Sequence, residues 1–285
     1  MSEHRRKVAV VTDSTSSLTQ AMGQERGIHV VPIHVAFGTQ TYRDGIDLDA
    51  DLFYRLLRDS KRLPTTSQPT AADFVQTYSS LSEHVEAIVS IHISHKMSAT
   101  FDSALLAGTQ LPHVPIHVID SHSVSMGLGL MSIAAARAAA AGHDAATVVR
   151  LVEELIPKMN VIFTVETLEY LHKGGRIGGA TVLVGSALSI KPVLYVKDGR
   201  IEPLEKPRTR RRAIERVLDL VAEQAGSSDV MHAVVLHCAA PDAAQNLAEQ
   251  MATRYECKEL LTVEAGPIIG THAGPGTLGV AFYTL

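Results

Sequence analysis

The chain has 285 residues, of which 46% are hydrophobic and 20% are charged, and its formal net charge is −4. This composition is typical of a globular protein rather than a disordered one, and it argues against a dedicated nucleic-acid-binding protein. The length suffices for one large domain or two moderate ones. Cys238 and Cys257 form no CxxC pair, and no apolar run of signal-peptide length precedes Asp13, so we expect a cytoplasmic, soluble protein.

The first part of the chain alternates short β-branched runs with longer helical patterns. Strands are predicted at residues 8–12, 28–37, 87–94 and 115–120. Apolar residues recur at helical spacing in residues 49–60, 71–81, 98–111, 126–142 and 145–159. Strands and helices in alternation predict βαβ units and a mainly parallel sheet. We therefore expect an N-terminal α/β domain over residues 1–157.

The second part of the chain has a different pattern. Residues 191–206 predict a hairpin, because Asp198-Gly199 is a strong two-residue turn signal between two alternating runs. Further strands are predicted at 160–166, 232–238 and near 259–264 and 279–284, and helices at 167–179, 210–224 and 242–254. Hairpin and helices together predict a second α/β domain, residues 158–285, with a mainly antiparallel sheet.

Four hydroxyl-rich loops stand out in the first domain. Residues 12–17, 94–100 and 120–127 follow predicted strands, and residues 64–70 run directly into a predicted helix. Ligands of open parallel sheets bind at the carboxyl ends of the strands, and helix N-termini favour anions. The pattern predicts a shared polar site. The alternative is that the serines of these loops cap helices, namely Ser14, Ser67, Ser98 and Ser125.

The sequence contains only weak indications of a catalytic serine or of a metal site. A serine nucleophile needs a nearby base, which His95, His122 or His272 could supply, but the chain has no G-x-S-x-G sequence. Its fourteen histidines include no H-E-x-x-H, and we expect no metal site.

Nucleotide and nucleic-acid sites are also weakly supported. Residues 274–279 match G-x-G-x-x-G in letters only, since the six residues that follow predict a strand, and there is no Walker A sequence. The basic run at 206–216 predicts a solvated helix face or, alternatively, a docking surface for an acidic or phosphate-bearing partner.

Seven segments, in order along the chain, resemble the DegV family, the fatty-acid-binding subunits of bacterial fatty acid kinase. They are VTDSTSSL (11–18), TTSQPT (65–70), ISHKMSATFDSA (93–104), DSHSVSMGLG (120–129), LEYLHKGGRIGGA (168–180), IKPVL (190–194) and GTHAGPGTLG (270–279). The resemblance covers essentially the whole chain.

The resemblance implies that two α/β domains clasp one long-chain fatty acid, whose tail lies in an apolar tunnel between them. By the same resemblance, the carboxylate is bound by Thr66, Ser67, Ser98 and His272. Hydroxyls and an imidazole can supply the hydrogen bonds that a buried carboxylate needs without a neutralising Lys or Arg. A separate ATP-dependent kinase would phosphorylate this carboxylate for phospholipid synthesis, so the chain itself is expected not to be an enzyme and to need no cofactor. Arg176 and Arg208 are implied as contacts to that kinase. Membrane contact is expected only transiently, for lipid exchange, and none with nucleic acid.

The chain departs from the family pattern near the expected carboxylate site. Family members usually have Ser-Gly-Thr where this chain has Ser98-Ala99-Thr100, often Ser at the position of His95, and commonly Ser at that of Thr70. The resemblance implies that the glycine- and proline-rich segment around His272 places the imidazole against the head group. From the residues alone, that segment predicts a tight turn before the last strand.

Two alternative functions remain at this stage. One is a serine-dependent acyl hydrolase that uses Ser98 or Ser67 with His272. The other is a DNA-binding regulator, against which the net charge of −4 and the aromatic content of 5% both argue.

Overall fold

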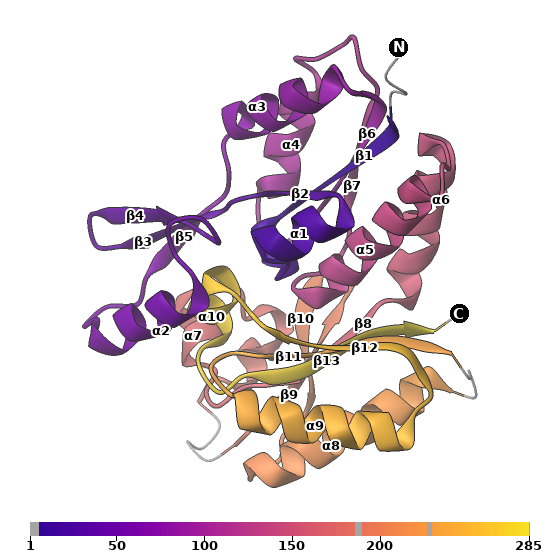
Figure 1. Ribbon diagram of the computed structural model, residues 1–285. Coiled ribbons are helices and arrows are strands. Elements are labelled where there is room, and N and C mark those ends of the chain that lie inside the picture. Colours follow the sequence, from indigo (N-terminus) through magenta and orange to yellow (C-terminus); the bar gives the residue numbers. More distant parts are fainter. Residues whose placement is uncertain (1–5, 186–189, 227–229, 285) are drawn as a thin grey trace.

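A four-stranded parallel sheet forms the centre of the N-terminal half (Figure 1). The computed structural model describes residues 6–185, 190–226 and 230–284. The strand order is β2-β1-β6-β7, with bounds Ile28–Val31 for β2, Arg6–Asp13 for β1, Val85–His92 for β6 and Ile116–Asp120 for β7. The parallel sheet predicted from the alternating pattern is confirmed.

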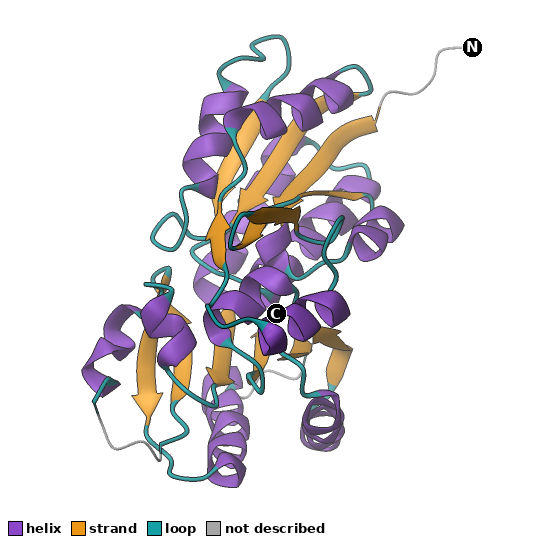
Figure 2. Ribbon diagram, turned by 90° about the vertical axis from the view of Figure 1, so that its left-hand side faces the viewer, coloured by secondary structure: helices purple, strands orange, loops and turns teal. Residues whose placement is uncertain are grey.

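Helices cover both faces of this sheet, as Figure 2 shows. They are α1 (Gln20–Arg26), α3 (Ala71–Ser82), α4 (Thr100–Gly108), α5 (Met126–Ala140) and α6 (Ala145–Leu155). Along β1, Val11 packs in a core cluster with Phe74 of α3, whereas its neighbour Val10 packs in the cluster that contains Met131 of α5. This alternation explains why the strand is apolar on both faces.

A second, three-stranded antiparallel sheet projects from the first, in the order β4-β3-β5 (Figure 1). Its strands are β3 (His34–Phe37), β4 (Gln40–Arg43) and β5 (Thr65–Ser67), and helix α2 (Ala50–Asp59) precedes β5. The prediction of one strand over residues 28–37 is wrong. Pro32 has no N–H for a sheet ladder, and the run divides there between two sheets.

The C-terminal half is built on a six-stranded mixed sheet in the order β10-β9-β8-β13-β11-β12. Its strands are β8 (Asn160–Thr164), β9 (Val193–Lys197), β10 (Arg200–Glu205), β11 (Met231–His237), β12 (Cys257–Glu264) and β13 (Leu278–Thr284). All neighbours are antiparallel except β11 and β12, so the mainly antiparallel sheet is confirmed. The predicted hairpin turn is confirmed too, with Asp198 at φ 47° and Gly199 at φ 76°.

Helices α8 (Arg210–Ala225) and α9 (Pro241–Arg254) cover one face of the six-stranded sheet. The other face packs against α5, which therefore lies between the two large sheets (Figure 1). Phe163 and Leu236 of the second half share a core cluster with Met131 of α5. The remaining short elements are α7 (Glu169–Lys173), α10 (Pro267–Ala273) and the 3-10 turns Ser14–Ser16, Ile156–Lys158 and Gly178–Leu183.

Sheet membership changes where the domain boundary was predicted. Within the described ranges, every strand of the first two sheets precedes Lys158 and every strand of the six-stranded sheet follows it. Because the largest core cluster includes residues of both halves, the division into separate domains at this point stays a prediction. None of the helices in the described part of the chain combines the length and the apolar character needed to cross a bilayer.

Candidate functional site: a cavity between the two halves

A cavity lies between the two halves of the molecule. Most of its lining is apolar and comes from both halves, with Ile33, Ile93 and Val124 from the first and Val161, Phe163 and Leu236 from the second.

A group of polar side chains lines the same cavity. It consists of Thr66, Ser98, Arg176 and His272. Thr66 Oγ1 and His272 Nε2 share a hydrogen bond of 2.9 Å, although the two residues are 206 positions apart. Strand β5 carries Thr66, and the last turn of α10 carries His272. His272 therefore lies in a short helix, and the predicted tight turn before the last strand follows that helix at Pro275 and Gly276.

The imidazole of His272 is held in a tight, desolvated place. A Cβ atom at position 174 would lie 2.4 Å from His272 Nδ1, so only glycine allows this approach. Nδ1 is buried and has no hydrogen-bond partner among the described residues. Burial, and to a smaller extent the positive charge of Arg176, lowers the pKa of His272 to about 4. The ring is therefore neutral near pH 7 and offers one donor and one acceptor.

Arg176 joins two of the segments that surround the cavity. Its Nε donates to the Met97 carbonyl at 3.1 Å, and its Nη1 donates to the Gly174 carbonyl at 2.8 Å. No hydrogen bond of Nη2 occurs within the described residues. The resemblance implied Arg176 as a contact to the kinase, and this stays a prediction. In the structure, its half-buried guanidinium lines the cavity, although the sequence reasoning expected a head group held without a cation.

Ser98 also lines the cavity, next to the segment that Arg176 holds. Its Oγ lies 2.8 Å from Thr100 Oγ1 and accepts the Thr100 backbone N–H at 3.3 Å. The N-cap residue of α4 is Ala99. Ser98 is therefore not the capping residue of that helix, and its hydroxyl lies at the cavity wall.

Two of the predicted site residues lie elsewhere. Ser67 is exposed and does not line the cavity, because adjacent strand residues point to opposite faces and Thr66 points inward. Arg208 is exposed just before α8 and does not line the cavity either. The structure thus brings Thr66, Ser98 and His272 together, and leaves Ser67 and Arg208 outside this group.

Other polar lining residues were not singled out from the sequence as ligand contacts. They are Thr15, Gln68, Ser125 and Thr277. Ser125 is the N-cap residue of α5 but makes no capping hydrogen bond, and its Oγ lies 3.0 Å from Ser17 Oγ. The sequence signal for the first three was the set of hydroxyl-rich loops, because each of the four loops contributes residues to this cavity, whereas Thr277 lies outside them.

Comparison with known proteins agrees with this architecture. The family model described as "Uncharacterised protein, DegV family" matches residues 7–285. The chain belongs to the DegV family. A DegV domain-containing protein of Streptomyces coelicolor is 41% identical over 278 residues, which cover 96% of this chain and 98% of that protein.

Two solved DegV structures are close in fold. One, described as fatty acid binding of a DegV family protein from Thermus thermophilus, has a TM-score of 0.93 and 35% identity, covering 98% of this chain and 100% of the other. The second is DegV of Bacillus subtilis, described as a fatty acid binding protein, with a TM-score of 0.91 and 33% identity over 98% of this chain and 100% of that one. The DegV fold of this chain is therefore shown over nearly its whole length.

Proposed function

We propose that this DegV family member binds one long-chain fatty acid in the cavity between its halves. The observation that carries the proposal is the lining itself, which combines apolar side chains from both halves with polar ones that include Thr66 and His272. Such a lining matches an amphiphile with one polar end and a long apolar tail. The two fatty-acid-binding DegV structures, at 35% and 33% identity, support the same ligand class.

The carboxylate would lie at the polar group. A carboxylate buried away from water needs several hydrogen bonds and is helped by a nearby positive charge. The hydroxyls of Thr66 and Ser98 supply donors, and Arg176 supplies the charge.

His272 would position one of these donors rather than bind the carboxylate by charge, because its lowered pKa keeps it neutral. If its Nε2–H donates to Thr66 Oγ1, the Thr66 O–H is left to donate to the ligand. His272 would then set the direction in which the Thr66 hydroxyl points.

The tail would supply most of the affinity. Each buried methylene contributes about 0.8 kcal/mol, whereas a typical hydrogen bond contributes about 1 kcal/mol net. Binding should therefore strengthen with chain length until the apolar part of the cavity is filled. The side chains that would contact the tail include Val124, Val161 and Phe163.

We further infer that the bound carboxylate is presented to a separate ATP-dependent kinase. In that step a carboxylate oxygen attacks the γ-phosphorus of ATP, ADP leaves, and an acyl phosphate forms. Two observations support a division of labour: the chain has no Walker A sequence, and most of the cavity lining is apolar. Arg208, which is exposed, and Arg176, which is half-buried, are the candidates for contact with the kinase. We expect this to occur in the cytoplasm, with only transient membrane contact.

The hydrolase alternative has no support from the hydrogen bonds of the site. His272 Nε2 contacts Thr66, and the Ser98 hydroxyl contacts Thr100, so neither described contact joins a serine to that base. A fluorophosphonate probe tests this directly. Labelling of Ser98 would favour the hydrolase, and absence of labelling would favour the carrier.

The test of the proposal is mass spectrometry of the purified protein, first native and then denatured and extracted with organic solvent. We expect one equivalent of fatty acid to be released on denaturation. A protein that is empty, and that also takes up none of palmitate, stearate and oleate, would contradict the proposal.

A further inference from the structure

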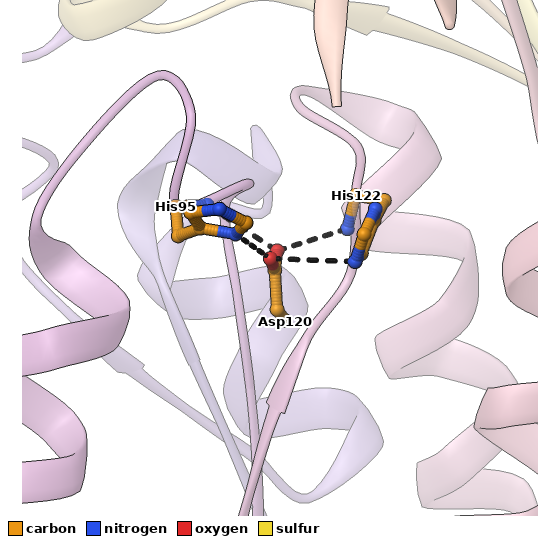
Figure 3. A group of neighbouring side chains, drawn as sticks. All are labelled: His95, Asp120 and His122. Carbon is orange, nitrogen blue, oxygen red and sulfur yellow. Dashed lines mark hydrogen bonds and ion pairs between the residues drawn. The ribbon is translucent and has the colours of Figure 1, made fainter. Parts of the chain in front are cut away.

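Three side chains that could bind a metal ion meet outside the cavity, at the carboxyl ends of β6 and β7 (Figure 3). Asp120 is the last residue of β7, His122 follows it, and His95 lies in the loop after β6. One possible ligand atom from each residue lies within 4.8 Å of the other two. Because β6 and β7 are neighbouring parallel strands, their ends bring together residues that are 25 positions apart in sequence.

The carboxylate of Asp120 is held in a fixed orientation. Its Oδ1 accepts the backbone N–H groups of His95 at 3.3 Å and of His122 at 3.0 Å. Its Oδ2 contacts His95 Nδ1 and lies 3.5 Å from His122 Nε2. One oxygen is thus anchored to the backbone while the other faces both imidazoles. Anchoring of this kind is what orients carboxylate ligands in metal sites.

The two imidazoles converge on the carboxylate (Figure 3). Their ring centroids are 6.0 Å apart with an interplanar angle of 80°, so the rings do not stack. His122 has φ 49°, an uncommon conformation for a residue other than glycine. That backbone conformation returns the chain toward Asp120 and allows the His122 N–H to reach Oδ1.

We propose that His95, Asp120 and His122 form a binding site for a divalent transition-metal ion, with Zn²⁺ the best match. Two imidazole nitrogens and one carboxylate oxygen are a ligand set that Zn²⁺ uses in proteins. Zn²⁺ ligands at about 2.0–2.1 Å from the ion are about 3.4 Å apart in a tetrahedron, which the observed spacing of up to 4.8 Å can reach by small side-chain rotations.

The surroundings suit such an ion. The side chains of His95 and His122 are 47% and 42% exposed, and that of Asp120 is 11% exposed. Solvent can therefore enter and complete the coordination with water. Our expectation of no metal site rested on the absence of H-E-x-x-H. That pattern presents ligands on one helix, whereas these ligands come from two separate strand ends.

The position of the site connects it to the cavity. Ser98 lies three residues after His95, Ser125 lies three residues after His122, and both serines line the cavity. A bound ion would cross-link the two loops that carry these serines. The expected result is a more rigid wall on that side of the cavity.

The experiment is a calorimetric titration of chelator-treated, full-length protein with ZnCl₂ in the absence of fatty acid. We expect one Zn²⁺ per chain, with affinity reduced at least about tenfold in Asp120→Asn and His122→Ala. Asp120→Asn keeps a side-chain oxygen for the backbone N–H groups while it removes the anionic ligand. The matched control is His117→Ala, an exposed histidine on the same strand β7, which should bind as the wild type does.

The proposal would be overturned if Asp120→Asn and His122→Ala bound Zn²⁺ with unchanged stoichiometry and affinity, or if the wild type bound none. Circular dichroism of each metal-free variant reports whether it is folded. Should either variant fail to fold, His95→Ala replaces it, since that side chain is about half exposed. No fatty acid takes part, so the outcome is independent of the proposed lipid function.

Discussion

Two histidines of this protein, His92 and His272, differ in how completely their hydrogen bonds are satisfied. His92 is completely buried at the end of β6, and both its ring nitrogens have partners, Asp13 Oδ2 at 3.0 Å and Ser90 Oγ at 2.7 Å. His272 at the cavity has one partner, Thr66, and its Nδ1 has none in the described structure.

The side chains that bind His92 make further hydrogen bonds of their own. Asp13 also accepts the backbone N–H groups of Thr15 at 3.0 Å and Ile93 at 3.1 Å, and Ser90 accepts the Tyr78 hydroxyl at 2.8 Å. A saturated buried network fixes a structure, whereas the hydrogen bond of His272 goes to Thr66 in the cavity wall and therefore acts on the lining. We therefore expect mutations at His92's network to affect folding, and mutations at His272 to affect binding.

The largest effect is expected from Asp13→Ala. It removes the buried carboxylate and leaves the His92 ring and two backbone N–H groups without their partner. The free energy of unfolding should fall by about 3–5 kcal/mol. Urea denaturation measures this, with the exposed Asp51→Ala as the matched control, for which a change within about 0.5 kcal/mol is expected. A loss at Asp13 no larger than at Asp51 would contradict the comparison.

The second prediction concerns pH. The pKa of His272 is lowered from 6.5 to about 4 by burial, so its contribution to stability is full above pH 6.5 and is lost as pH falls toward about 4. In that window the ligand-free wild type should lose up to about 3 kcal/mol more than His272→Gln.

Urea denaturation of both proteins at a series of pH values tests this prediction. Burial raises the pKa of Asp44 to about 7, which gives the opposite slope, but this contribution is common to both proteins and cancels in the difference. Parallel stability curves for the two proteins would show that His272 titrates normally.

A smaller effect is expected on ligand affinity. His272→Ala removes the partner that orients the Thr66 hydroxyl, and the dissociation constant for oleate should rise about tenfold, or about 1.4 kcal/mol. His272→Gln keeps an N–H donor and should stay within about threefold of wild type. Displacement of a fluorescent fatty acid measures both. Equal losses in the two variants would mean that the imidazole acts through its shape rather than through Thr66.

The smallest effect on binding is expected from Ser98→Ala. If the tail supplies most of the affinity, as proposed, the dissociation constant should change by less than about threefold, while acyl phosphate formation with the proposed partner kinase should fall further. The exposed Ser67→Ala is the matched control, since Ser67 does not line the cavity. A folded Ser98→Ala protein that has lost all bound lipid would mean that the head group, rather than the tail, supplies most of the affinity.

Local sequence signals predicted most of the fold. The β-branched runs, the helical spacing and the Asp198-Gly199 turn correspond to strands, helices and a hairpin in the structure. The small sheet was not predicted, because β5 is only three residues long and pairs with β3, which lies across α2 in the sequence. Such pairing depends on contacts between distant residues that no local pattern records.

The candidate site was predictable in part. Thr66, Ser98 and His272 were named through the family resemblance, and the structure brings them to one cavity. The inward direction of Arg176 was not predictable, since it depends on the Met97 and Gly174 carbonyls that orient its side chain. The proximity of His95 and His122 was not predictable either, because it depends on the register of β6 and β7 and on the positive φ of His122.

The position of helix α5 between the two large sheets limits the ways in which a ligand could enter and leave the cavity. With one helix packed against both large sheets, the two halves cannot swing apart without exposing the largest core cluster to water. The small sheet that carries Thr66 and the helix that carries His272 belong instead to a separate core cluster with Ile33, Val35 and Phe53. We therefore expect fatty acid to enter and leave when this smaller cluster loosens beside Thr66 and His272. The exchange rate would then be set by this local opening rather than by separation of the two halves.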